Sequence, residues 1–112
     1  MNRVKVALIQ MKMSSEKSKN ISNAISKIHA AKKKGANIIC LPELFLTNYF
    51  CQSEKHSNFN LAEKIPGTTT EIFSPIAKKL KIILILSLFE KRTSGIYHNT
   101  CIIIDENGKI KG

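Results

Sequence analysis

The chain lacks several features that mark particular classes of protein. It has no tryptophan, and only 6% of its 112 residues are aromatic. No long apolar segment follows residues 1–5, so we predict no signal peptide. The longest apolar run, residues 82–86, is far too short to span a bilayer, which excludes a membrane-spanning helix. We therefore expect a cytoplasmic protein with no membrane partner.

Cysteine is scarce, and none of the three cysteines belongs to a CxxC pair. Their spacing to the histidines does not fit zinc ligation, so no metal site is predicted. Cys40 and Cys101 lie in apolar segments and are expected to be inert core thiols. Cys51 lies in a polar segment and is expected to be exposed, and a nucleophilic role for it would need a base partner.

Acidic residues are few: the chain has 8 aspartates and glutamates but 18 lysines and arginines, which gives a formal net charge of +10. The densest lysine groups, at residues 32–34 and 78–81, fall at the C-terminal ends of predicted helices. Cations there interact favourably with the helix dipole, so solvated helix ends are the favoured interpretation. A non-enzymatic, lysine-rich module that binds nucleic acid is the alternative. It is disfavoured because no aromatic residues for base stacking lie among the lysines.

The first 41 residues have a β-α-β pattern. Residues 4–10 predict a mostly buried strand, and Ser14 or Ser15 is a suitable N-cap for the helix that follows. The apolar residues that follow have the spacing of one face of a helix: Ile21, Ala24, Ile25, Ile28 and Ala31. Gly35 can end this helix, and residues 37–41 form the next strand. This order favours a parallel pair of strands with a right-handed crossover.

The second half begins with a polar, irregular connection over residues 47–64, of a length that is often functional. Apolar spacing predicts a helix over residues 72–80 that contains Pro75. Either the helix starts late, with Ser74 as its N-cap, or its first turn is distorted. Residues 82–89 predict a strand buried on both faces, and residues 97–104 predict another. Asn107-Gly108 then indicates a hairpin turn.

The strongest candidate for a functional residue is Glu43. The apolar strand before it stops at Pro42, which cannot donate a hydrogen bond to a sheet. Glu43 therefore lies at the carboxyl end of a buried strand, where ligands bind in open α/β sheets. Apolar neighbours would partly desolvate its carboxylate, which suits a general base. The alternative is a glutamate that simply points into solvent.

Several segments together resemble the start of a carbon–nitrogen hydrolase of the nitrilase superfamily. Their order and spacing agree across essentially the whole chain. The matching segments are Val6–Gln10, Leu41–Phe45, Ile65–Thr69, Phe89–Lys91 and Tyr97–Thr100. The resemblance implies an α/β fold, namely the N-terminal part of a nitrilase-like αββα sandwich. Residues 1–112 would then be the N-terminal part of a single hydrolase domain, truncated at its C-terminal side.

The resemblance also implies a catalytic Glu-Lys-Cys set that uses no metal or organic cofactor. Glu43 matches the glutamate, the general base that takes the proton of the cysteine thiol. The lysine and the cysteine of the family come after residue 112. Lys109, Lys111, Cys51 and Cys101 occupy other positions of the pattern and are not given these roles. The full-length form is expected to be a homo-oligomer, and residues 1–112 alone are expected to be inactive.

Within the superfamily, Tyr49-Phe50-Cys51-Gln52 most resembles the N-carbamoylputrescine amidase group. This implies a small-molecule carbamoyl amine or amide substrate, hydrolysed to putrescine, carbon dioxide and ammonia in polyamine biosynthesis. Tyr49 and Cys51 are candidate substrate-binding residues. The alternatives are a β-ureidopropionase, an ω-amidase or another amidase of the superfamily.

Other residues in the matching segments have structural interpretations. Pro66-Gly67 is a turn, and Asn99 is expected to fix backbone or loop geometry. Glu90 ends a strand, as Glu43 does, and a surface pair with Lys91 or Arg92 is favoured over a supporting role in the site. His98 has no evident partner in the sequence.

Overall fold

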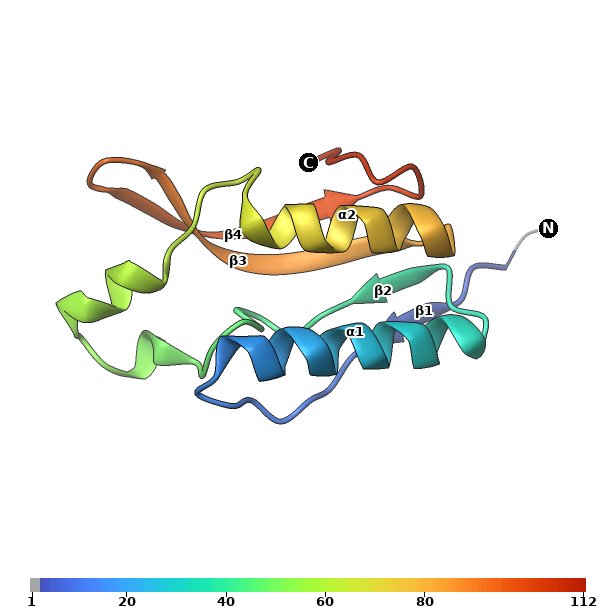
Figure 1. The fold of residues 1–112 in the computed structure, drawn as a ribbon, viewed down its shortest axis with the longest axis horizontal. Coiled ribbons are helices and arrows are strands. Elements are labelled where there is room, and N and C mark those ends of the chain that lie inside the picture. Colours follow the sequence, from blue (N-terminus) through green and yellow to red (C-terminus); the bar gives the residue numbers. More distant parts are fainter. Residues whose placement is uncertain (1–2) are drawn as a thin grey trace.

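A four-stranded mixed sheet carries two helices on one face in the computed structural model, which describes residues 3–112 (Figure 1). The strands lie in the order β1-β2-β3-β4; the first two pairs are parallel and the last is antiparallel. The elements along the chain are β1 (Val6–Leu8), α1 (Lys17–Lys33), β2 (Ile38–Cys40), the 3₁₀ turns η1 (Phe50–Gln52) and η2 (His56–Leu61), α2 (Thr68–Leu80), β3 (Ile83–Thr93) and β4 (Ile96–Ile104).

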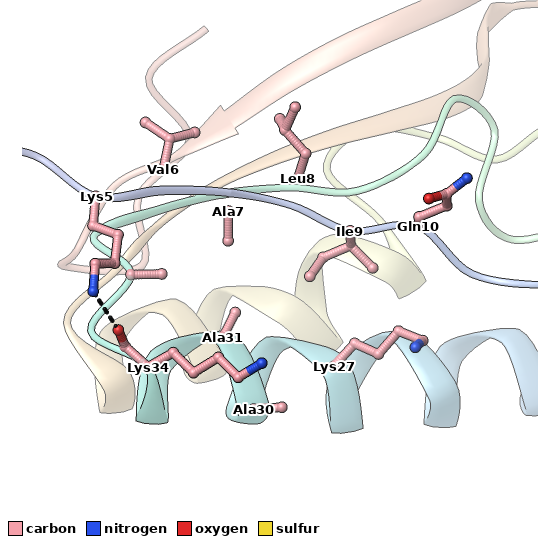
Figure 2. A pocket seen from close by; sticks show the side chains of 11 residues that line it. Lys5, Val6, Ala7, Leu8, Ile9, Gln10, Lys27, Ala30, Ala31 and Lys34 are labelled. Carbon is pink, nitrogen blue, oxygen red and sulfur yellow. Dashed lines mark hydrogen bonds between the residues drawn. The ribbon is translucent and has the colours of Figure 1, made fainter.

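The predicted β-α-β opening is confirmed, but the prediction that the first strand is mostly buried is wrong. Val6 is 56% exposed and Leu8 is 79% exposed. Strand β1 is an edge strand, and these two side chains point away from α1, whereas Ala7 and Ile9 point toward it (Figure 2). One face of β1 is therefore covered by a helix and the other is not.

Helix α1 begins after Glu16 and not after a serine. The Ser14 hydroxyl instead accepts a hydrogen bond from the backbone N–H of Glu16, within the turn that precedes the helix. The predicted end is confirmed, because Gly35 follows the C-cap with a φ of +90°. The lysine groups also lie where the sequence places them, with Lys32 and Lys33 in the last turn of α1.

Helix α2 begins much earlier than either alternative for Pro75 allows. Gly67 is its N-cap, and the Thr70 hydroxyl accepts a hydrogen bond of 2.8 Å from the Gly67 N–H. A Cβ at Gly67 would collide with the carbonyl oxygen of Lys64, so this position requires glycine. Pro75 lies inside the helix and removes one helical N–H donor. Phe73 and Ala77, on either side of Pro75, are fully buried, and such tertiary packing favours the helix.

Strand β3 alternates between buried and half-buried residues, so the prediction of burial on both faces is wrong. Both helices cover the same face of the sheet (Figure 1), and the other face is open. The core lies between the helices and the sheet, and its members include Ala24, Ile28, Ile39, Phe45, Phe73, Ala77, Leu84, Leu86, Leu88, Ile102 and Ile104. The chain therefore provides one helical layer and one sheet layer of the expected sandwich.

The predicted turn after β4 is confirmed. The Asp105 carboxylate accepts hydrogen bonds of 2.9 Å from the backbone N–H groups of Lys109 and Asn107. These hydrogen bonds, chiefly the one from Lys109, lower the pKa of Asp105 below its usual value. The chain then returns along β4, where the Lys111 N–H donates to the carbonyl oxygen of Ile103.

Candidate functional site

Glu43 follows Pro42, three residues after the end of β2, at the carboxyl end of the parallel strands. The three residues after it, Leu44, Phe45 and Leu46, are all buried, so the loop that carries Glu43 is anchored in the core. The Glu43 side chain itself is exposed. The predicted position at the strand end is confirmed, but the predicted desolvation by apolar neighbours is wrong because those neighbours turn inward.

Asn99 of β4 contacts Glu43 directly, and Ser87 of β3 contacts both Asn99 and the backbone beside Glu43. The Asn99 amide donates a hydrogen bond of 2.6 Å from Nδ2 to Oε1 of Glu43. The Ser87 hydroxyl donates to Oδ1 of Asn99 at 3.3 Å and accepts from the Leu44 N–H at 3.0 Å. Asn99 was expected to fix backbone or loop geometry, and the structure shows that it contacts the candidate base directly.

A buried asparagine ties the Glu43 loop to α1. Asn20 donates from Nδ2 to the carbonyl oxygens of Ser14 and Leu46, at 2.8 and 2.9 Å. Its Oδ1 accepts from the Ser14 N–H at 2.8 Å. Both polar atoms of the Asn20 side chain are thus hydrogen-bonded, and they link the start of α1 to the loop after β2.

Glu43 lines a recess of about 360 Å³ on the face of the sheet that the helices do not cover. Its lining residues are Cys40, Leu41, Glu43, Ile85, Leu86, Ser87, Asn99 and Cys101. Cys40 is half-buried and Cys101 is exposed, so the prediction that both are core thiols is wrong. Both strands are apolar, but these two side chains point to the open face.

Tyr49 and Cys51 are exposed, as predicted for Cys51, and both lie in the connection that follows the Glu43 loop. The negative charge of Glu43, and after it the Cys51 side chain, raise the pKa of the Tyr49 phenol. These three sequence-predicted residues are therefore electrostatic neighbours. Tyr49 remains a neutral hydroxyl, able to donate a hydrogen bond, further into the alkaline range than an ordinary tyrosine.

The predicted pair of Glu90 with Arg92 is present, but Glu90 is buried and lies inside β3, not on the surface at a strand end. Its side chain is only 6% exposed and accepts a hydrogen bond of 2.7 Å from the Thr100 hydroxyl. Arg92 lies 3.6 Å from one carboxylate oxygen, and Nδ1 of His98 lies 3.9 Å from the other. His98 therefore has a partner that the sequence did not indicate. This cluster is on the helix-covered face, away from the Glu43 recess.

A larger groove of about 460 Å³ lies between β1 and α1. Apolar side chains of both elements line it, and the lysines at its rim are Lys5, Lys27 and Lys34 (Figure 2). The Lys5 ammonium donates to the carbonyl oxygen of Lys34 at 2.8 Å. The groove contains no candidate residue from the sequence, so its size does not make it the candidate site.

Residues 3–112 contain no group of histidine, cysteine and acidic side chains that could bind a metal ion. No helix in this range is long and apolar enough to cross a membrane. Sequence reasoning missed Ser87, and it gave Asn99 only a role in backbone or loop geometry. The only local signal was Ser87, a polar residue that interrupts the apolar run of residues 82–89, whereas Asn99 lies among the polar residues His98 and Thr100 and does not stand out.

Comparison with known proteins agrees with this geometry. The carbon–nitrogen hydrolase family matches residues 5–112. An omega-amidase of Mus musculus is 38% identical over 98% of this chain and 38% of its own length. An N-carbamoylputrescine amidase of Oryza sativa subsp. japonica is 37% identical over 96% of this chain and 36% of its own length.

A solved structure has the same arrangement of elements. The crystal structure of a carbon–nitrogen hydrolase from Helicobacter pylori G27 aligns with a TM-score of 0.91 and 34% identity. The alignment covers 97% of this chain and 38% of that chain, so this chain spans well under half the length of these relatives. Since the family match extends over nearly every residue, the chain belongs to the carbon–nitrogen hydrolase family of the nitrilase superfamily.

Proposed function

We propose that residues 1–112 are the N-terminal part of a single hydrolase domain that cleaves non-peptide C–N bonds, with Glu43 as its general base. The observation that carries this proposal is the Glu43 carboxylate at the strand end, with Oε1 held by Asn99. The open, apolar sheet face supports the proposal that further protein covers it in the full-length form. A homo-oligomeric, cytoplasmic enzyme is part of the same proposal.

In this mechanism Glu43 removes the proton from a cysteine thiol that lies outside these residues. The thiolate attacks the carbamoyl or amide carbon, and a lysine, also outside them, stabilises the oxyanion. The C–N bond breaks, the leaving nitrogen takes the proton from Glu43, and water hydrolyses the thioester. Residues 1–112 by themselves would lack turnover, because the three groups act as a unit.

N-carbamoylputrescine is the proposed substrate, and one water molecule converts it to putrescine, carbon dioxide and ammonia. The N-carbamoylputrescine amidases of Oryza sativa subsp. japonica and Solanum lycopersicum, at 37% and 38% identity, support this choice. An ω-amidase is the second candidate, because the mouse omega-amidase is equally similar at 38%. A β-ureidopropionase is a third candidate within the superfamily.

A substrate panel on the purified full-length protein separates these activities. We expect kcat/KM for N-carbamoylputrescine to exceed that for carbamoyl amino acids and for simple amides by about 10-fold or more. One missing favourable contact in a pocket is worth about 10-fold or more in discrimination. The measurement is ammonia release at matched concentrations. A simple amide turned over fastest would favour the ω-amidase assignment, and a carbamoyl acid would favour the ureidopropionase.

Tyr49 is proposed to contact the substrate through its hydroxyl group. Tyr49→Phe in the full-length protein should raise KM about 3- to 10-fold with kcat nearly unchanged, the effect of one lost neutral hydrogen bond. Because the pKa of Tyr49 is raised, KM of the unmodified protein should stay flat well into the alkaline range. Steady-state kinetics across pH test both statements.

The matched control is Tyr97→Phe. Tyr97 packs its ring on Phe59, with 4.6 Å between ring centroids, so removing its hydroxyl should leave KM unchanged. An equal rise in KM for both variants, or none for Tyr49→Phe, would remove Tyr49 from the substrate site. Cys51→Ala then tests the other candidate contact in the same assay.

A further inference from the structure

We propose that Asn99 and Ser87 are positioning residues that hold the Glu43 carboxylate in one orientation for proton transfer. This inference rests on the proposed role of Glu43 as the general base. The two residues come from β4 and β3, whereas Glu43 lies in the loop after β2, so three separate segments meet at this point.

The polarity of the hydrogen bonds permits only one arrangement of the Asn99 amide. An ionised carboxylate only accepts hydrogen bonds, so the NH₂ group of Asn99 must face Glu43. The Leu44 N–H donates to the Ser87 oxygen, and the serine therefore directs its own hydrogen to Oδ1 of Asn99. The Leu44 N–H, the Ser87 hydroxyl and the Asn99 amide each donate to an acceptor in this arrangement, which makes the flipped amide unfavourable.

Ser87 also holds the backbone beside Glu43. Leu44 has a φ of +50°, in the left-handed region that a leucine rarely occupies. The hydrogen bond to Ser87 at 3.0 Å and the burial of Leu44 maintain this conformation. One serine thus fixes both the backbone that carries Glu43 and the amide that contacts its carboxylate.

The arrangement restrains one carboxylate oxygen and leaves the other available. Oε1 accepts the 2.6 Å bond from Asn99, whereas Oε2 makes no hydrogen bond within residues 3–112. A general base needs an oxygen that can receive a proton, carried by a group whose orientation is already set. The contacts at Glu43 meet both requirements.

Substitution of Asn99 in the full-length protein tests this proposal. Asn99→Ala should lower kcat about 10- to 100-fold with little change in KM, because a misdirected base slows the chemical step more than substrate binding. Asn99→Asp places a second carboxyl group against Glu43. Two carboxyl groups at this distance do not both ionise readily, so the acidic limb of the kcat/KM profile should move to higher pH by about one unit or more.

Asn107→Asp is the control for the added charge, because it makes the same change in the exposed turn after β4. Its pH profile should match that of the unmodified protein. A purely structural role for Asn99 would lower activity at every pH without moving the limb. Ser87→Ala should also lower kcat, and Ser87→Thr should restore most of it because the hydroxyl group is kept.

The outcomes separate this inference from the proposed function. If Glu43→Gln is inactive but the Asn99 variants keep normal kcat and pH profiles, the positioning role is wrong and the general base stands. If Glu43→Gln keeps full activity, Glu43 is not the general base, and the positioning role that rests on it is wrong as well. If Asn99→Asp moves the acidic limb of the kcat/KM profile and Asn107→Asp does not, the positioning role of Asn99 and the general-base role of Glu43 are both supported.

Discussion

Glu43→Gln in the full-length protein is expected to lower kcat about 10²- to 10⁴-fold, the usual cost of losing a general base. The amide has nearly the shape of the carboxylate and its oxygen can still accept the Asn99 hydrogen bond, so the fold should be unchanged. It cannot take a proton from a thiol at neutral pH. The measurement is ammonia release from N-carbamoylputrescine, with circular dichroism to compare the folds.

The matched control for that substitution is Glu106→Gln, in the exposed turn after β4. This change removes the same charge at a position remote from the recess and should leave kcat unchanged. A Glu43→Gln protein with the normal rate would show that Glu43 is not in the mechanism. A loss of activity accompanied by unfolding would assign Glu43 a structural role instead.

Phe73→Ala is expected to cost about 3–5 kcal/mol in free energy of unfolding, the range for truncating a fully buried phenylalanine. Phe73 is 0% exposed, and its ring meets that of Phe45 edge-on at 5.4 Å between centroids. Phe45 belongs to the loop that carries Glu43. The substitution should therefore loosen the candidate site as well as the contact between α2 and the sheet. Denaturant titration of the full-length protein measures the loss.

Phe59→Ala provides the comparison within the same residue type. Phe59 is 44% exposed and packs on other aromatic rings at the surface, so its loss should cost much less than that of Phe73. Equal losses for the two variants would contradict the assignment of the core to the space between the helices and the sheet. Residual activity of Phe73→Ala below its denaturation midpoint would report how far the Glu43 loop depends on that core.

Local sequence patterns determined the order of elements and the position of the candidate base. Apolar runs and their periods predicted the β-α-β opening and the strands that became β3 and β4, because each pattern reflects its own element's burial. Pro42 placed Glu43 at a strand end, since a proline cannot continue the hydrogen bonding of a sheet. The motifs together indicated the family, and the family match over residues 5–112 confirmed it.

Only the tertiary structure decided what each face of an element meets. Val6, Leu8 and Cys101 lie in apolar strands but point to the open face, because both helices pack on the other side. The same physical reason explains why Ser87 was missed and why Asn99 was given only a role in loop geometry. They are far from Glu43 in sequence and lie near it only because β3 pairs with β2 and β4 pairs with β3, so no local pattern could bring the three side chains together.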